Sequence, residues 1–426
     1  MPTDSRKGVM PAVLVLMIAL TAGVARADSS LGPVQLVEIA TEVNPQVRAA
    51  RDRWYSAMHQ IRQNYAPADP IFGYANVDSA TNGFSEASLH ALTVTESFQF
   101  PGKALLQADN AKRSAEIARL TYEAMLRDVR AQTETDYYQI LLDGALADVQ
   151  AETVSDLEQV LKVTQVAYSA NQVTQTDFIS AELDLAAARQ NQRQLHTSEL
   201  NDETSLNQLL FRRPDEPLNL DRKLELKALE IPVDKLADLA ARVRQEILET
   251  ALAERSSETA MELAKLEYAP DYTLGYTFDN YLLSSAAPSS TGRMQDHGFS
   301  ISFNAPLFFW LKQTEDEKRT GFDLAAARED LDSIRSQTAA GVTNLYRTTR
   351  LAYETALLYR DSLIPLARQD FAVALVAYQS GKIDFVTLAS ALRRSYDARV
   401  AYLQAANQFL ATRVALEQAI GQPLPR

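Results

Sequence analysis

The sequence predicts a mostly α-helical protein with a small β part, in which two structural repeats each combine long coiled helices with one β-hairpin. Three observations support this fold class. Long intervals are rich in helix-forming residues, two short segments alternate between apolar and polar residues, and the second half repeats the order of the first. Glycine and proline, 14 and 16 among 426 residues, are too scarce for a protein rich in turns.

Four long intervals favour helices. Residues 103–168 contain no proline and a single glycine, Gly144. This interval predicts a very long helix, either unbroken or with one break. At about 1.5 Å per residue, it reaches on the order of 100 Å, which is longer than a compact domain accommodates in one element. Similar intervals cover residues 173–210, 311–364 and 382–420. The sequence therefore predicts an elongated helical body.

Two of these intervals carry a coiled-coil seam, because apolar residues recur in steps built from threes and fours. Small alanines within the seams permit close approach of the helices. In residues 173–210 the seam comprises Phe178, Ala181, Leu185, Ala188 and Leu195. In residues 382–420 it comprises Leu388, Ala391, Ala398, Tyr402, Ala405, Phe409 and Leu416.

Two segments, at about residues 70–100 and 271–305, are predicted hairpins. In the second, Tyr276 and Phe278 alternate with polar residues, a loop is expected over 284–295, and Phe299 begins a similar alternation. The first is weaker: its turn is Thr81-Asn82-Gly83, and Glu96 interrupts its apolar face. Each strand approaches the roughly 9 to 11 residues that cross a bilayer when tilted.

The hairpins leave two interpretations open. One is an ordinary antiparallel sheet that is covered by helices in a soluble protein. The other is a membrane wall, which cannot have open edges in lipid, so that four strands have to be closed by other copies of the chain. Three copies would supply a twelve-stranded membrane β-barrel.

An internal repeat appears when the chain is aligned with itself at an offset of 210 positions. Ala167-Tyr168 then matches Ala377-Tyr378, and Asn171 matches Gly381. The hairpins match at offsets between 202 and 205. We therefore expect a first repeat over 28–220 and a second over 221–426, each with the order helix, hairpin, long helix, turn, helix.

The first residues are typical of a cleaved signal peptide. Arg6 and Lys7 precede an apolar run over 12–20 and the small-residue sequence Ala25-Arg26-Ala27, so residues 1–27 are predicted to be removed on export. The chain has no cysteine and therefore no disulfide or lipidated cysteine. A net charge of −13 at pH 7 argues against nucleic-acid binding.

The sequence offers no catalytic, cofactor-binding or metal-binding motif. Its four histidines are far apart and lack ligand spacing. Phosphate-binding glycine loops and hydrolase motifs are absent from the sequence. We therefore predict that the protein is not an enzyme and needs no cofactor.

The matching segments 167–171 and 377–381, together with the duplicated order of elements, resemble the TolC-like outer membrane efflux family over essentially the whole mature chain. The family's Ala-Tyr-x-x-Gly turn is intact in residues 377–381 and is altered in residues 167–171, where asparagine takes the place of glycine. The corners Phe100-Pro101-Gly102-Lys103 and Asn304-Ala305-Pro306-Leu307-Phe308 are most similar to the heavy-metal and cation branch.

The resemblance implies a homotrimer that sits in outer membrane lipid as a twelve-stranded barrel and extends across the periplasm as an α-helical barrel. The turns with Tyr168, Asn171, Tyr378 and Gly381 would form the periplasmic tip. There they would meet a periplasmic membrane fusion adaptor, which connects the channel to an inner membrane pump of the resistance-nodulation-division type. The channel itself would be passive.

In relatives, acidic residues six and nine positions after the second turn glycine close the tip. This chain has Thr387 and Ser390 there, so an acidic gate is in doubt. Asp177 and Asp384 lie nearby, and negative charge in a narrow pore attracts cations. The alternative is that both aspartates stabilise helix N-termini through the helix dipole.

Together these features predict a trans-periplasmic duct that exports metal cations or small toxic compounds. Two alternatives stay open. One is the exit duct of a type I protein secretion system, which would have the same shape. The other is a soluble periplasmic coiled-coil scaffold, in which the hairpins serve only as structural caps.

Overall fold

The computed structural model describes residues 30–81, 84–222, 225–284 and 291–424. The predicted signal peptide lies outside these residues, as do Asn82-Gly83 of the first hairpin turn and residues 285–290 of the second. Within the described chain, the observed elements confirm a mostly helical protein with one small sheet.

The elements follow one order twice, which confirms the repeated plan: two short helices, a hairpin and a pair of long helices. The first series is α1 (Pro33–Val43), α2 (Pro45–Tyr65), β1 (Ile71–Thr81), β2 (Phe84–Phe98), α3 (Lys103–Ser169) and α4 (Gln175–Leu209). The second series is α5 (Val233–Val243), α6 (Gln245–Leu266), β3 (Tyr272–Ser284), β4 (Thr291–Phe303), α7 (Gln313–Leu358), a π-helical turn (Tyr359–Leu363), α8 (Ile364–Gln379) and α9 (Phe385–Ile420).

The longest element, α3, runs for 67 residues without a break. Its counterpart in the second series begins and ends 210 positions later but is divided into α7, the π turn and α8. Pro365 explains the division: it lies at the start of α8 and has no N–H to give to the preceding turn. The π turn absorbs this missing hydrogen bond, so the two helices continue as one rod.

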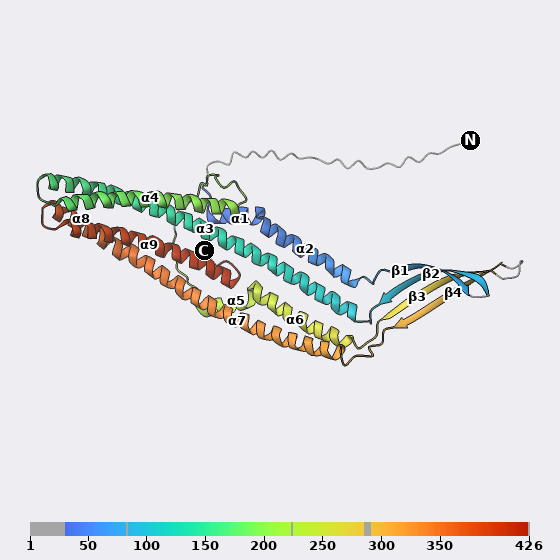
Figure 1. Cartoon of the computed structure of the whole chain (residues 1–426). Coiled ribbons are helices and arrows are strands. Elements are labelled where there is room, and N and C mark those ends of the chain that lie inside the picture. The colour runs from blue at the N-terminus through green and yellow to red at the C-terminus, as the bar shows by residue number, and fades with distance from the viewer. Residues whose placement is uncertain (1–29, 82–83, 223–224, 285–290, 425–426) are drawn as a thin grey trace, which may run out of the picture.

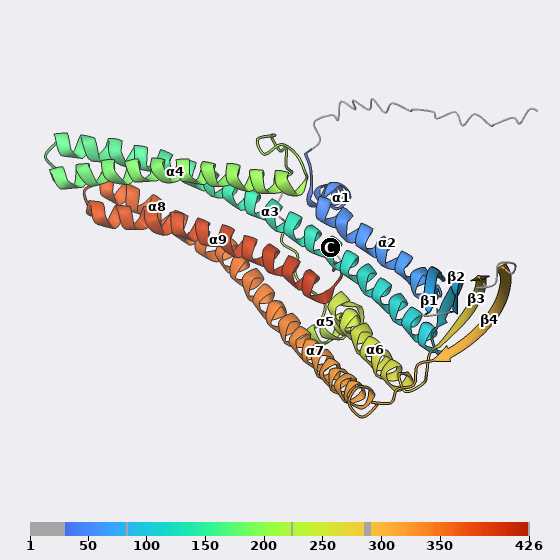
Figure 2. The ribbon, with the colours of Figure 1, turned by 45° about the vertical axis from the view of Figure 1, so that its right-hand side comes forward.

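The helices form an elongated, curved body with the sheet at one end and the α3–α4 and α8–α9 turns at the other (Figures 1 and 2). Near the sheet, neighbouring helices follow the order α2, α3, α6, α7. Toward the turns, α3 packs on α4 and α9, and α9 packs on α8. Both repeats thus contribute side by side to one wall.

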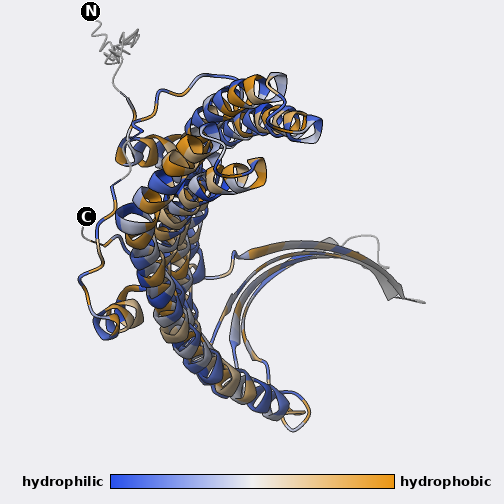
Figure 3. Ribbon diagram, turned by 90° about the vertical axis from the view of Figure 1, so that its left-hand side faces the viewer, coloured by the Kyte–Doolittle hydropathy of each residue, from blue (hydrophilic) through white to orange (hydrophobic). Residues whose placement is uncertain are grey.

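The sheet contains the four strands in chain order, with every neighbouring pair antiparallel. It curves as an arc rather than lying flat over the helices (Figure 3). β1 and β4 form its two edges. The sheet joins the two repeats, because β2 of the first pairs with β3 of the second along its length.

The predicted loop over residues 284–295 is too long, and its C-terminal boundary is wrong. β4 begins at Thr291, and Gln295 pairs with Asn280 and Met294 with Tyr281 in the ladder. Ladder hydrogen bonds join backbone groups, so polar side chains do not end a strand when its partner continues. The strands are 11 to 15 residues long, slightly longer than expected.

The predicted seams are largely confirmed as core positions. Ala181, Leu185 and Ala188 of α4 are buried, as are most seam residues of α9, including Leu388 and Phe409. Phe178 and Leu195 are only partly buried: Phe178 lies in the first turn of α4, and Leu195 lies between the buried groups at 181–188 and 206–207.

Candidate functional site

The two helix turns at the end remote from the sheet have the same backbone geometry. After α3, Asn171 has φ of 55°, and after α8, Gly381 has φ of 69°. In each turn, the amide of this residue donates to the carbonyl three positions earlier, and the next amide donates to the carbonyl five positions earlier. This is the Schellman helix ending, which requires the left-handed conformation that glycine and asparagine accept.

Asp177 and Asp384 both cap the helices that leave these turns. The Asp384 carboxylate accepts the Thr387 amide at 2.9 Å, and the hydrogen bonds from Thr387 lower the pKa of this exposed carboxyl group. Asp177 lies three residues after the capping Thr174, and its carboxylate accepts the Thr174 amide at 3.0 Å. The structure therefore places each aspartate at a helix N-terminus, the arrangement that the dipole alternative expects.

The two tip tyrosines differ although they occupy equivalent positions. Tyr168 is exposed and stacks on Phe178, with ring centroids 5.9 Å apart. Tyr378 is buried, contacts the edge of Phe385, and has its hydroxyl 3.3 Å from that of Thr164 in α3. Tyr378 therefore ties the second turn to the first repeat, whereas Tyr168 supports only its own turn.

Thr387 and Ser390 lie on the first turns of α9, and both side chains are exposed. Asp384 and Val386 in the same segment are also exposed, whereas Phe385 and Leu388 are buried. Thr387 and Ser390 carry no charge, so neither supplies the acidic residue that relatives have at its position.

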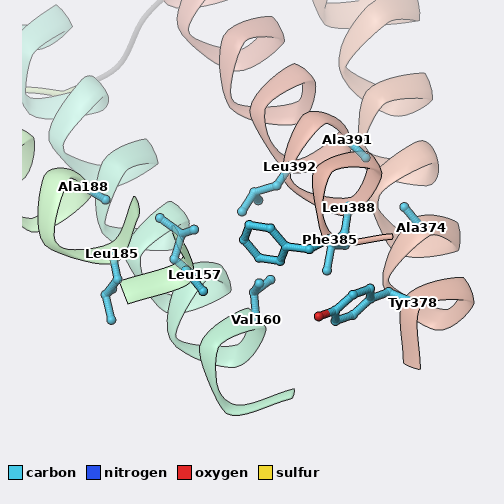
Figure 4. Close-up of a cluster of buried hydrophobic side chains, with 11 residues drawn as sticks. Leu157, Val160, Leu185, Ala188, Ala374, Tyr378, Phe385, Leu388, Ala391 and Leu392 are labelled. Carbon is cyan, nitrogen blue, oxygen red and sulfur yellow. The ribbon is translucent and has the colours of Figure 1, made fainter. Parts of the chain in front are cut away.

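A hydrophobic cluster behind the turns joins the two repeats. Figure 4 shows Phe385 of α9 directed toward Leu157 and Val160 of α3, with Tyr378 beside it. Burial of apolar surface stabilises this junction by about 25 cal/mol per Å². The cluster holds both turns at one level, so they form a common end of the wall.

Sequence reasoning missed two exposed apolar residues one turn before the tip. Val166 of α3 is 68% exposed, and Val376 of α8 is 65% exposed. They are 210 positions apart, so the internal repeat contained the signal for this pair. Val386 at the start of α9 is similarly exposed. Exposed apolar residues that recur at equivalent positions indicate a contact surface rather than chance.

A layer of polar side chains farther from the tip connects α3, α4 and α9. Arg399 is almost fully buried and pairs with Glu152, and it also reaches the Thr153 hydroxyl at 3.4 Å. On the other side, Gln150 donates to the Ala188 carbonyl at 3.0 Å. These bonds fix the lateral register of helices from both repeats.

One face of the sheet is mainly apolar on the described side chains, with Glu96 and His297 as polar interruptions. Direct pairing aligns Phe72 of β1, Val94 of β2, Tyr276 of β3 and Phe299 of β4 in one row. Phe299 is 87% exposed. The sequence pattern of the first strand was ambiguous, and the register resolves it because Phe72 rather than Ile71 shares the face of Phe299.

The histidines of the sheet also repeat, which the sequence spacing did not reveal. The Tyr74 hydroxyl is hydrogen-bonded to Nδ1 of His90 at 2.9 Å, and the Tyr276 hydroxyl to Nδ1 of His297 at 2.8 Å. Each pair lies diagonally across two neighbouring strands. His90 and His297 therefore take part in hydrogen bonds between neighbouring strands on the sheet surface.

No group of three or more potential metal ligands occurs in the described ranges. In the same part of the chain, every helix is too short or too polar to cross a membrane. The described residues form a helical wall. One end carries the sheet with its apolar face, and the other end carries the two equivalent helix turns.

Comparison with known proteins supports this architecture. The sequence profile of the outer membrane efflux protein family matches residues 236–422. No curated protein matches the chain significantly.

Several solved structures share the fold. The outer membrane protein VceC from Vibrio cholerae has 15% identity and a TM-score of 0.75, with 92% of this chain and 96% of that chain covered. The open-state MtrE outer membrane channel of Neisseria gonorrhoeae has 15% identity and a TM-score of 0.74, with coverage of 92% and 89%. CusC has 13% identity, a TM-score of 0.78 and coverage of 92% of each chain.

These likenesses confirm the resemblance on two levels. The profile match covers the second repeat, and the structural matches extend the same fold over both repeats. The second repeat thus matches the outer membrane efflux protein family, and the described residues of the chain have the fold of outer membrane channels.

Proposed function

We propose that the chain is one subunit of a homotrimeric outer membrane channel, the passive trans-periplasmic duct of a tripartite efflux system. The observation that carries this proposal is a curved four-stranded sheet with two open edges and an exposed apolar face. In lipid, open edges leave backbone groups without hydrogen bonds. Closure with two further copies gives twelve strands and removes every edge.

Exposed apolar side chains on the lateral helices support assembly with other copies. Ile179 and Leu183 are exposed on α4, and Leu366 and Val373 are exposed on α8. These helices lie at the sides of the wall near the tip, where adjacent subunits would meet. Contact between them would bury surface that a single chain leaves in water.

The tip supports a protein partner. The equivalent turns at Asn171 and Gly381, with Val166 and Val376 beside them, present two similar surfaces per chain. A trimer would repeat them six times around its end, which suits a ring of periplasmic membrane fusion adaptors. Such an adaptor would couple the duct to an inner membrane pump of the resistance-nodulation-division type.

The cargo is proposed to be metal cations or small toxic compounds. Net negative charge and the exposed Asp384 carboxylate favour cations over anions in a narrow opening. Asp177 contributes a second carboxylate per chain at the equivalent turn. Screening over about 10 Å limits this preference to the narrowest part of the pore.

Deletion of the gene tests the function against the two alternatives. An efflux duct predicts increased sensitivity to metal cations or small toxic compounds, with secreted proteins unchanged. Loss of one protein from the medium would instead identify the exit duct of a type I secretion system. Recovery of the protein in the soluble periplasmic fraction without detergent would identify the scaffold.

Charge at the tip is tested separately by ion selectivity. D384A is expected to reduce cation preference of the pore if Asp384 lies at the constriction. S390A is a matched control because it alters an exposed α9 residue nearby without changing charge. Equal selectivity of wild type and D384A would leave Asp384 as a helix cap only.

A further inference from the structure

A short apolar segment, residues 307–311, follows β4 at the sheet end of the helical body. Its sequence is Leu-Phe-Phe-Trp-Leu, and its five side chains are between 47% and 70% exposed. The backbone is well ordered by hydrogen bonds: the Leu311 amide donates to the Phe308 carbonyl at 3.0 Å, and the Thr314 amide to the Phe309 carbonyl at 2.9 Å. The exposure therefore belongs to a defined turn.

The first repeat has no such segment at the equivalent corner. There, α3 begins directly after Pro101-Gly102, and Lys103 is buried. Lys103 forms an ion pair with Asp271 at 2.9 Å, and the Phe100 amide donates to the same carboxylate at 2.7 Å. The corner of the first repeat thus closes the base of the sheet, and the apolar turn of the second repeat is an addition.

The additional turn follows β4, whose last apolar residues are also exposed. Ile301 and Phe303, the last apolar residues of the strand on that face, are 64% and 67% exposed. After the strand, the Asn304 amide donates a hydrogen bond of 3.2 Å to the Asp271 carbonyl, which ends the ladder. Residues 307–311 follow three to seven positions after Asn304 and are exposed like Ile301 and Phe303.

The apolar face of the strands is too short for an outer membrane. Its lowest row contains Phe98, Tyr272 and Phe303, and its upper boundary is a polar row that pairs His90, Asn280 and Gln295. The last row below this boundary with large apolar side chains contains Leu92 and Phe278 beside His297. It lies six residues above Tyr272, which is about 20 Å along a strand and about 15 Å in height at a usual tilt. Lipid-facing bands of such barrels are about 25 Å tall.

The side chains of the turn suit the boundary between hydrocarbon and headgroups. Trp310 and Phe309 meet edge to face with centroids 5.3 Å apart, and Tyr268 lies beside Phe309 with centroids 6.4 Å apart. Aromatic side chains concentrate at this depth of membranes. Lys312 follows immediately, and a cation beside an apolar turn complements anionic phospholipid.

We propose that residues 307–311 insert into the periplasmic leaflet of the outer membrane as an anchor, three copies of which surround the base of the barrel. The occupant of this apolar surface is phospholipid. The inference rests on the proposed channel function and adds a membrane contact outside the strands. It supplies the missing apolar height at the periplasmic side.

Fluorescence quenching by lipid tests the anchor. Among the 426 residues there are two tryptophans, Trp54 and Trp310, so W54F leaves Trp310 as the only reporter. The full mature protein is reconstituted in vesicles with brominated or unbrominated phospholipid. We expect brominated lipid to cause a loss of Trp310 fluorescence. The matched control is W310F, whose remaining Trp54 stacks on Tyr122 of α3 in the helical body and should keep its fluorescence.

A third protein separates failure of the anchor from failure of the channel proposal. F299W in the W54F/W310F background reports on the sheet itself. Quenching of this probe without quenching of Trp310 would overturn the anchor and leave the membrane sheet intact. In that case, protection of Trp310 from acrylamide would assign the turn to a neighbouring subunit, and accessibility to acrylamide would leave it in water. If neither probe is quenched, both proposals fail.

Discussion

Replacement of Phe299 by arginine tests whether the apolar face of the sheet meets lipid. Phe299 lies within the apolar rows of β4, and 87% of its side chain is exposed in the single chain. In water, an exposed phenylalanine contributes little to folding, so F299R would change the free energy of unfolding by no more than about 0.5 kcal/mol. In lipid, the same arginine faces hydrocarbon.

The free-energy cost of an arginine that faces lipid depends on its depth in the bilayer. Arginine near the middle of a barrel's apolar band destabilises the folded protein by about 2 to 4 kcal/mol. That range is a loss of roughly 30- to 700-fold in the folding equilibrium of each subunit. The measurement is the fraction of folded protein in vesicles as a function of urea concentration.

Ser302 provides the control. It lies on the same strand but on the opposite face, pairs with Thr273, and is exposed. S302R introduces the same charge toward the proposed lumen and should change the folding equilibrium much less. Equal, small effects of F299R and S302R would refute the lipid-facing assignment, because they would place both faces in water.

Three further predictions concern the helical body. E246Q should destabilise the folded chain by about 2 kcal/mol at pH 7, because hydrogen bonds from Arg127 outweigh burial and hold the pKa of Glu246 to about 2. This contribution should disappear in wild type as the pH falls from about 4.5 toward 2, and an unchanged urea midpoint at pH 7 would contradict it. Asp202 behaves oppositely, since burial and a neighbouring carboxyl group raise its pKa from 3.8 to about 6. D202N should therefore stabilise the protein by about 1 kcal/mol at pH 8, after allowance for solvent screening. Below pH 4 it should have no such effect, and thermal unfolding at both pH values checks the difference. G381V should destabilise the tip by about 1 to 2 kcal/mol because φ is 69°, whereas N171G should be nearly neutral. Hydrogen exchange of the backbone amides in each turn checks this difference. Equal protection of the substituted turn in the two variants would contradict the reasoning.

The fold was largely accessible from the sequence because its strongest signals are long and repeated. Scarce glycine and proline over 103–168 predicted a very long helix with or without one break, and α3 is the unbroken form. The offset that aligns Asn171 with Gly381 identified two turns whose backbones proved equivalent. Backbone conformation at these positions is a local property, so residue type was a sufficient guide.

Features that depend on partners across the structure were less accessible. The extra length of β4 follows from pairing with β3, which polar residues such as Gln295 did not signal. The burial of Arg399 between repeats required the position of Glu152 on another helix. The sequence analysis treated residues 304–308 only as a corner after the hairpin, and the exposure of residues 307–311 became evident only in the structure.

Site residues divide in the same way. The sequence placed Asp177 and Asp384 near the tip, and the structure gives both a capping role through local hydrogen bonds. Whether they also line a constriction depends on neighbouring subunits. The different environments of Tyr168 and Tyr378 likewise arise from contacts between repeats, which no single motif contains.

Single-channel conductance of the purified mature protein in planar lipid bilayers, with subunits counted by crosslinking, tests the central claim most directly. The account predicts trimers that form stable, cation-preferring pores. A monomer that stays soluble without detergent and never conducts would contradict the outer membrane channel and favour the periplasmic scaffold.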